Sequence, residues 1–238
     1  GDNDLFPNLY EHFLAKLTDH FLGIYTSPGN HDIQRSRTSE DVATKFIEDT
    51  EQTYLFDNNS NLVLDNPFEE NPFENYFNLQ EAICDFDQTN FFYAKKSTGP
   101  IRFVSLNSSW LCAKRANGVS DEGKLRIDPA IIDDVNKDWA SDVFNICLTH
   151  HPLNWLNIEQ RGDVARKISD HFDLHLFGHE HTPSATLQGF DNGGCLTLQS
   201  PAALSKYGHG SNAYSIIDIE PKQKRVRVRY RTHSVPRG

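Results

Sequence analysis

Three short polar strings, each directly after an apolar run, most constrain the fold of this chain. The apolar runs cover 24–27, 143–149 and 174–177 and have the composition of buried strands. In open α/β sheets ligands collect at the carboxyl ends of parallel strands, so polar strings in these positions are predicted to meet at one edge of a sheet. The strings read Gly29-Asn30-His31-Asp32, His150-His151-Pro152 and Gly178-His179-Glu180-His181.

The rest of the pattern predicts a mixed α/β domain. Apolar residues at steps of four predict a helix over 7–22, and a second helix is expected over 163–171. Strands over 91–94 and 101–106, joined by a turn at 97–100, form a predicted hairpin. Further strands are expected over 195–199, 213–219 and 225–231. We interpret 1–238 as a single domain.

The stretch over 33–90 is polar and acidic and interrupts this order, so we interpret it as an insertion or cap. A helix is expected over 39–53. The string Asn-Pro-Phe-Glu occurs at 66–69 and again at 71–74, where each Asn-Pro pair favours a turn over further helix. The repeat either binds a partner or pins a surface loop to the body through its aromatic side chains. Those side chains are Phe68, Phe73, Tyr76 and Phe77.

Composition indicates a chain that buries a large core, since 37% of its 238 residues are hydrophobic. Four cysteines occur singly without a CxxC pair, which fits a reducing compartment. No stretch approaches the roughly 18 apolar residues of a membrane span, and no secretory signal opens the chain. The expected localisation is cytoplasmic, with no membrane partner.

The last predicted strand has two chemically different faces. Arginines alternate with apolar residues, so one face is cationic and the other is apolar. A cationic face can track a phosphate backbone. The competing reading is a solvated charged face that protects an edge strand from pairing, and the net charge of −10 favours it. The arginines are Arg225, Arg227, Arg229 and Arg231.

The three polar strings carry ligands for divalent metal ions. Asn30 offers a neutral carbonyl oxygen, and imidazole nitrogens come from His150, His179 and His181. Two ions roughly 4 Å apart clamp a phosphate, activate a water and stabilise charge on the leaving oxygen. Because His179 and His181 lie two residues apart, they can reach different ions. His151 is expected beside the ligands rather than on a metal.

In this order the strings resemble the calcineurin-like metallophosphoesterase family, and the resemblance covers most of the chain. It implies a four-layer α/β/β/α sandwich of two mixed sheets flanked by helices, with the insertion as a cap. It also implies a centre of two divalent ions, drawn from Mn, Fe, Zn and Mg, with Mn favoured. The sequences at 28–35 and 148–155 look like the bacterial branch, which is often joined to NTPase or signalling modules.

The resemblance assigns ligand roles to individual residues. Asn30, His150 and His179 would bind one ion, and His181 would bind the other. Asp2, in the Gly-Asp pair at the start of the sequence, would supply the carboxylate that bridges the ions.

The resemblance also implies catalytic roles. His31 would contact the phosphate or protonate the leaving group, and Asp32 would orient that imidazole. Three further groups are expected to meet the substrate. They are Arg35, which can hold a phosphate bidentately or remain solvated, His151, and His209, which lies between two glycines.

One part of the family pattern is missing. No Asp-x-His string precedes the Gly-Asp pair, which is where the family pattern places it. We expect that the chain is truncated at its N-terminus and belongs to a longer protein. The alternative is a centre that has lost two ligands and binds one ion weakly.

The resulting hypothesis is a metal-dependent phosphoric ester hydrolase in which a metal-bound hydroxide attacks the phosphorus in line. A phosphodiester in nucleic acid or a nucleotide is the expected substrate, so nuclease activity is one expected form of this phosphodiesterase. One alternative is a phosphomonoesterase that acts on proteins or small molecules. The other is a degenerate domain that binds a nucleotide or a partner chain without hydrolysis.

Overall fold

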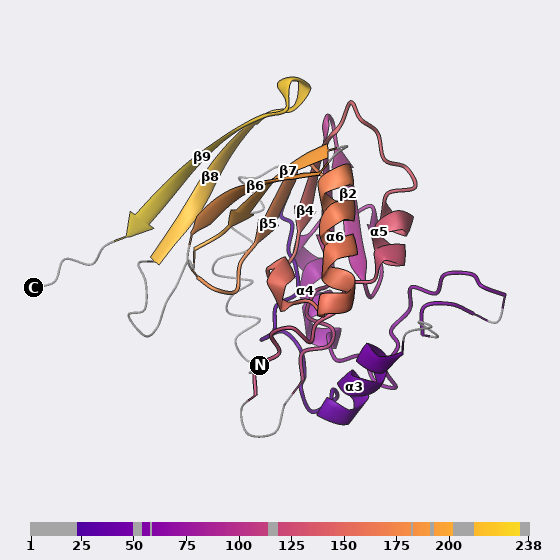
Figure 1. Cartoon of the computed structure of the whole chain (residues 1–238). Coiled ribbons are helices and arrows are strands. Elements are labelled where there is room, and N and C mark those ends of the chain that lie inside the picture. Colours follow the sequence, from indigo (N-terminus) through magenta and orange to yellow (C-terminus); the bar gives the residue numbers. More distant parts are fainter. Residues whose placement is uncertain are drawn as a thin grey trace, which may run out of the picture.

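The computed structural model describes residues 23–49, 54–57, 59–113, 119–181, 183–190, 193–201 and 212–233, which form a mixed α/β fold (Figure 1). The predicted helix over 7–22 and the candidate residues Asp2 and His209 lie outside these ranges. Among the described helices, none has the length and apolar character that crossing a membrane requires.

A seven-stranded mixed sheet forms the centre of the fold. Its four middle strands are parallel, and antiparallel strands flank them on both sides. The parallel arrangement places the carboxyl ends of the predicted strands over 143–149 and 174–177 at one edge of the sheet. In spatial order the strands are β1 (Gln88–Thr89), β2 (Tyr93–Thr98), β3 (Ile101–Leu106), β4 (Phe144–Leu148), β5 (Leu174–Phe177), β7 (Gly193–Gln199) and β6 (Ser184–Phe190).

Helices cover one face of this sheet. α5 (Pro129–Val135) and α6 (Ile158–His171) lie over this face (Figure 1). Their apolar side chains belong to the larger hydrophobic core, together with Val104 of β3 and Cys147 of β4. Helix α6 confirms the predicted helix over 163–171 but begins earlier, where the side chain of Asn157 accepts a hydrogen bond from the Glu159 N–H. α5 was not predicted.

A two-stranded sheet covers the opposite face. β8 (Asn212–Glu220) and β9 (Arg225–His233) pair antiparallel, with η4 (Pro221–Gln223) between them. Because successive strand residues point to opposite faces, β4 buries Phe144 and Ile146 here while Cys147 faces the helices. Ile217 of β8 and Val228 of β9 pack against this second core. Helices, large sheet and small sheet are therefore successive layers, which confirms a mixed α/β fold with two sheets.

The described part of the predicted insertion contains two helices, where one was predicted. α3 (Glu40–Glu48) begins at Ser39, whose side chain caps it, and it ends earlier than predicted. α4 (Glu74–Ile83) was not predicted, and the expectation of turns without further helix was wrong. The Asn-Pro pair restricts only the residues up to Pro72, so a helix can begin directly after the turn in which Asn71 Oδ1 accepts from the Phe73 N–H (2.9 Å).

Aromatic residues hold the insertion against the body. Phe73 is fully buried, and its ring centroid lies 6.0 Å from that of Phe91. Phe68 packs 6.2 Å from Trp110, which is also fully buried in the main core. These contacts confirm the reading in which the aromatic side chains pin the segment to the body.

The predicted strand over 24–27 is absent, because residues 23–29 have no regular secondary structure. Both hydrogen-bonding edges of the neighbouring strand β3 are occupied, one by β2 and the other by β4. The segment is held through side chains instead. The ring of Tyr25 stacks on Phe103 at 4.1 Å, and Ser27 Oγ donates to the Leu106 carbonyl (3.3 Å).

Candidate metal centre

The carboxyl ends of two neighbouring parallel strands bring two of the predicted strings together. His150 follows β4 and His179 follows β5, each by two residues. Backbone hydrogen bonds join the two connections, from Thr149 N–H to the Leu176 carbonyl (3.0 Å) and from Gly178 N–H to the His150 carbonyl (3.1 Å). The parallel sheet thus fixes the separation of the two histidine backbones.

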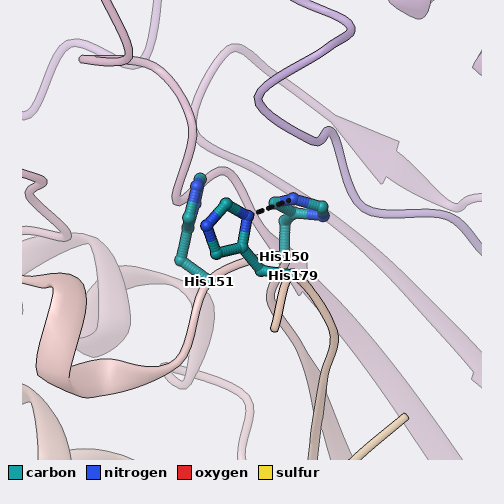
Figure 2. A group of neighbouring side chains, drawn as sticks. All are labelled: His150, His151 and His179. Carbon is teal, nitrogen blue, oxygen red and sulfur yellow. Dashed lines mark hydrogen bonds between the residues drawn. The ribbon is translucent and has the colours of Figure 1, made fainter. Parts of the chain in front are cut away.

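The loop that carries Asn30 also meets these histidines, although Asn30 lies 120 residues before His150 in the chain. Asn30 Oδ1 lies 3.0 Å from His150 Nε2, which in turn lies 3.1 Å from His179 Nδ1. Figure 2 shows the imidazole rings of His150, His151 and His179, which we call the histidine cluster, with the contact between His150 and His179 drawn as a dashed line. Gly29 permits the approach, because a Cβ at that position would lie only 3.0 Å from the His150 ring.

Two separations in this group suit ligands of a common divalent ion. Donors about 2.1 Å from one ion lie about 3 Å from each other, which matches the distances from His150 Nε2 to Asn30 Oδ1 and to His179 Nδ1. Imidazole nitrogens suit Zn and Fe, and a carbonyl oxygen suits Mg and Mn. The donor set is therefore chemically appropriate for the class of metal expected from the sequence.

Burial keeps the histidines of the cluster neutral. It lowers the pKa of His150 to about 4, with a further contribution from neighbouring His179, and the pKa of His179 is also lowered mainly by burial. Burial lowers the pKa of His151 to about 2, with His150 adding to the effect. Neutral imidazole is the form that offers a lone pair to a metal ion, so these groups are ready to bind at neutral pH.

His151 lies behind the other two histidines and is only 1% exposed. Its Nδ1 lies 3.2 Å from Ser108 Oγ, and its Nε2 lies 3.8 Å from Cys112 Sγ. Ring nitrogens of His150, His151 and His179 nevertheless lie within 4.8 Å of one another, so the place of His151 beside the ligands rather than on a metal stays a prediction.

Residues directly after β3 connect the loops of the cluster. Ser108 Oγ accepts from the backbone N–H groups of His150 (3.2 Å) and His151 (3.1 Å). A hydroxyl can accept two hydrogen bonds and donate one, and the third partner of this oxygen is His151 Nδ1. Ser109 Oγ donates to the Pro28 carbonyl (2.8 Å), so the adjacent serine holds the loop of Asn30.

Trp155, in η3 (Leu153–Trp155), forms a wall beside His179. The edge of one ring meets the other at a centroid distance of 4.1 Å. Trp155 Nε1 donates to Glu180 Oε1 (3.2 Å), so the carboxylate next to His179 is directed to the indole. Sequence reasoning assigned no role to Ser109 or Trp155. The sequence indicates these two residues only by their position, since Ser109 lies three residues after β3 and Trp155 lies four residues after His151.

The Gly-His-Glu-His string has an unusual backbone. His179 has φ 69° and His181 has φ 59°, both in the left-handed region that residues with a Cβ rarely adopt. Strain of this kind is concentrated at functional sites, where surrounding contacts maintain it.

The remaining candidates lie around this cluster with different exposure. His31, Asp32 and His181 are exposed. Asp32 Oδ2 accepts a hydrogen bond from the Gly29 backbone N–H (2.8 Å), which lies in the same loop. Arg35 Nη2 donates to the Asn30 backbone carbonyl (3.2 Å) and so lies next to the loop, and its contact with a substrate stays a prediction.

Comparisons with known proteins were consistent with this arrangement. The sequence model of a family described as "Calcineurin-like phosphoesterase" matches residues 2–183. A protein of Bacillus subtilis (strain 168) with the name "Uncharacterized metallophosphoesterase-like protein YydB" is 20% identical over 213 residues. The matched region covers 87% of this chain and 43% of that protein, so the chain spans less than half the length of this relative.

Proposed function

We propose, because the chain belongs to the calcineurin-like phosphoesterase family, that it hydrolyses phosphodiesters in nucleic acid or nucleotides with two divalent metal ions. The observation that carries the proposal is the convergence of Asn30 Oδ1, His150 Nε2 and His179 Nδ1, which are the atoms suited to one ion. His181 and Asp2 are the ligands proposed for the second ion, and Mn is the metal that we favour.

The chain's own residues would orient the substrate and move protons. When bound, the ions would polarise the phosphoryl group and activate a water nucleophile. His31 is exposed on the loop that carries Asn30, so its imidazole is available to protonate the leaving oxygen, with Asp32 beside it in the loop. The Arg35 guanidinium lies at the base of the same loop and is the proposed partner of a phosphate oxygen.

Two assays with small substrates test the reaction class. The purified full-length protein is given bis-p-nitrophenyl phosphate or p-nitrophenyl phosphate in the presence of Mn²⁺. We expect faster turnover of the diester and loss of turnover after chelation. A preference for the monoester would instead identify a phosphomonoesterase, and metal-independent turnover would contradict the proposal.

Variants separate chemistry from metal binding. His31→Ala should lower kcat for the diester by about 100-fold or more, the contribution typical of a general acid, while Mn²⁺ binding is retained. His150→Ala should lose Mn²⁺ binding measured by calorimetry. His171→Gln, at the far end of α6, is the matched control and should change neither quantity. If wild type binds Mn²⁺ and nucleotide without hydrolysing either substrate, the chain is a binding domain.

A further inference from the structure

The outer surface of the two-stranded sheet carries a row of exposed arginines, which we call the arginine face. It consists of Arg225, Arg227, Arg229 and Arg231, all exposed. Val226 and Val228 point the other way and pack into the second core. The alternation predicted from the sequence is therefore present, and the packing fixes the cationic side outward. Alternate residues of a strand are about 6.8 Å apart, so the guanidinium groups form a regularly spaced row.

Carboxylates on β8 neutralise only part of this row. Glu220 lies 3.6 Å from Arg225, and Asp218, which is opposite Arg227 in register, pairs with Arg229 at 2.9 Å. Within the described residues, Arg227 and Arg231 have no carboxylate at ion-pairing distance, so the face has an excess of two positive charges. The ion pairs of Arg225 and Arg229 are exposed, and exposed ion pairs contribute little energy. A phosphate can therefore compete with the carboxylates for these two arginines.

One end of the arginine face adjoins the metal loop through a series of contacts. Gln199 Nε2 donates to Glu180 Oε2 (3.4 Å), the residue between the two histidines of the loop. Ser184 Oγ donates to Gln199 Oε1 (3.2 Å), and the Ser184 carbonyl accepts from Tyr230 Oη (3.3 Å). Arg231 is the next residue after Tyr230. Figure 1 shows β8 and β9 beside β6, in agreement with this connection.

The same end carries an exposed aromatic ring. Tyr214 of β8 is 58% exposed and lies opposite Arg231 in the antiparallel register, so both side chains are on the outer face. Cationic groups that follow a backbone, combined with an aromatic ring on which an unpaired base stacks, are the features by which proteins bind single-stranded nucleic acid.

We propose that the arginine face, with Tyr214, binds a single-stranded nucleic acid and leads it to the metal centre. This inference rests on the proposed function for its substrate class. The charge of the arginine face indicates its ligand. The whole chain has a net charge of −10 and would repel a polyanion, whereas this cationic row would attract one. The nucleic acid would leave the arginine face at Arg231 and pass to the loop of His179 and His181.

Salt dependence of binding tests the proposal without requiring hydrolysis. A fluorescently labelled polythymidine strand is titrated with the full-length protein in chelator, and anisotropy is recorded at several salt concentrations. Each phosphate contact with single-stranded nucleic acid contributes about 0.7 to the slope of log K against log salt concentration. Arg227→Gln and Arg231→Gln should each lower the slope by about that amount. Tyr214→Ala should weaken binding about fivefold or more with little change in slope.

Arg166→Gln is the control, because this arginine of α6 is exposed like Arg227 and Arg231 but lies away from the arginine face, where it pairs with carboxylates of its own helix. It should leave affinity and slope unchanged. An equal effect of Arg166→Gln, absence of binding by wild type, or tighter binding of duplex than of single strand would overturn the inference. Hydrolysis of bis-p-nitrophenyl phosphate by wild type is measured separately, so failure of the proposed function is distinguished from failure of this surface.

Discussion

A single buried hydroxyl governs the placement of the two adjacent histidines. Ser108 Oγ accepts from the backbone N–H groups of both His150 and His151, and it also contacts the His151 ring. If Ser108 is the donor in that last contact, it fixes the tautomer of His151 with its proton on Nε2, toward Cys112 Sγ. The position of the His150 backbone, which carries the proposed ligand, therefore depends on a residue that is not itself a proposed ligand.

Ser108→Ala should lower Mn²⁺ affinity by about 10- to 100-fold, the range measured when a group that positions a metal ligand is removed. Isothermal titration calorimetry measures the change. Ser105→Ala is the matched control, since the Ser105 hydroxyl is equally buried but has no hydrogen-bond partner among the described residues. Unchanged Mn²⁺ affinity in Ser108→Ala, in a protein that remains folded, would refute the positioning role.

Burial of His175, on β5, is expected to make the free energy of unfolding depend on pH. It is fully buried, and burial lowers its pKa to about 4, so the imidazole is neutral in the folded state. Thr149 Oγ1 donates to the His151 carbonyl (2.8 Å), so it accepts from His175 Nε2 (2.9 Å). His175 Nδ1 has no partner among the described residues, and a proton there would be buried without an acceptor.

Because this pKa in the folded state lies below the unfolded value of about 6.5, the unfolded state binds more protons between the two values. The stabilising effect of neutral His175 is complete above about pH 6.5 and is lost as the pH falls toward 4. The free energy of unfolding should drop by at most about 3 kcal/mol over this window from this group. Urea titrations at several pH values measure the decrease, and His175→Gln should show a flatter profile; an identical profile would exclude His175 as the origin.

Among the elements, the segment predicted to be an insertion or cap packs into the main core. Its aromatic residues share one hydrophobic cluster with β3, α5 and α6. α4 begins where Phe73 enters that cluster, so a loop-like sequence acquires a helix through tertiary packing. The same packing explains why α3 and α4 lie on the body instead of remaining solvated.

Phe73→Ala should lower the free energy of unfolding by about 3–5 kcal/mol, because it removes a large side chain with no exposed surface and leaves a cavity. Chemical denaturation provides the measurement. Leu187→Ala, at a position that is 75% exposed on β6, should change the free energy by no more than about 0.5 kcal/mol. A small effect of Phe73→Ala would mean that the insertion unfolds independently of the body.

For the whole molecule, a bound metal would connect segments that are far apart in sequence. The loop of Asn30 lies 120 residues before His150 and 149 residues before His179 in the chain, and the three loops meet through their proposed ligand atoms. An ion that binds only when these loops are assembled stabilises the folded state of the entire chain.

Mn²⁺ at about a thousandfold over its dissociation constant should therefore raise the free energy of unfolding by about 4 kcal/mol, and chelation should reverse the gain. Differential scanning calorimetry records the shift in Tm. His150→Ala is expected to show no Mn²⁺-dependent shift. The same shift in the variant as in wild type would indicate that the ion binds elsewhere.

Local patterns were sufficient for much of the fold and for the identity of the candidate ligands. Apolar runs predicted the strands that became β4 and β5, and the alternation in the last segment predicted β9 with its cationic face. The strings after those strands named His150 and His179 as neighbours. These features depend on periodicity and on residue chemistry within a few positions, which a sequence displays directly.

Tertiary structure alone decided the features that depend on distant partners. The run over 24–27 is apolar enough for a strand, yet it lies beside β3, whose two edges are already paired with β2 and β4. α4 formed in a polar segment because Phe73 could be buried, and Ser108 acquired its role only when β3 was placed beside β4. Hydrogen bonds and burial between residues far apart in the chain carry no local signal, so the fold had to assemble before their effects existed.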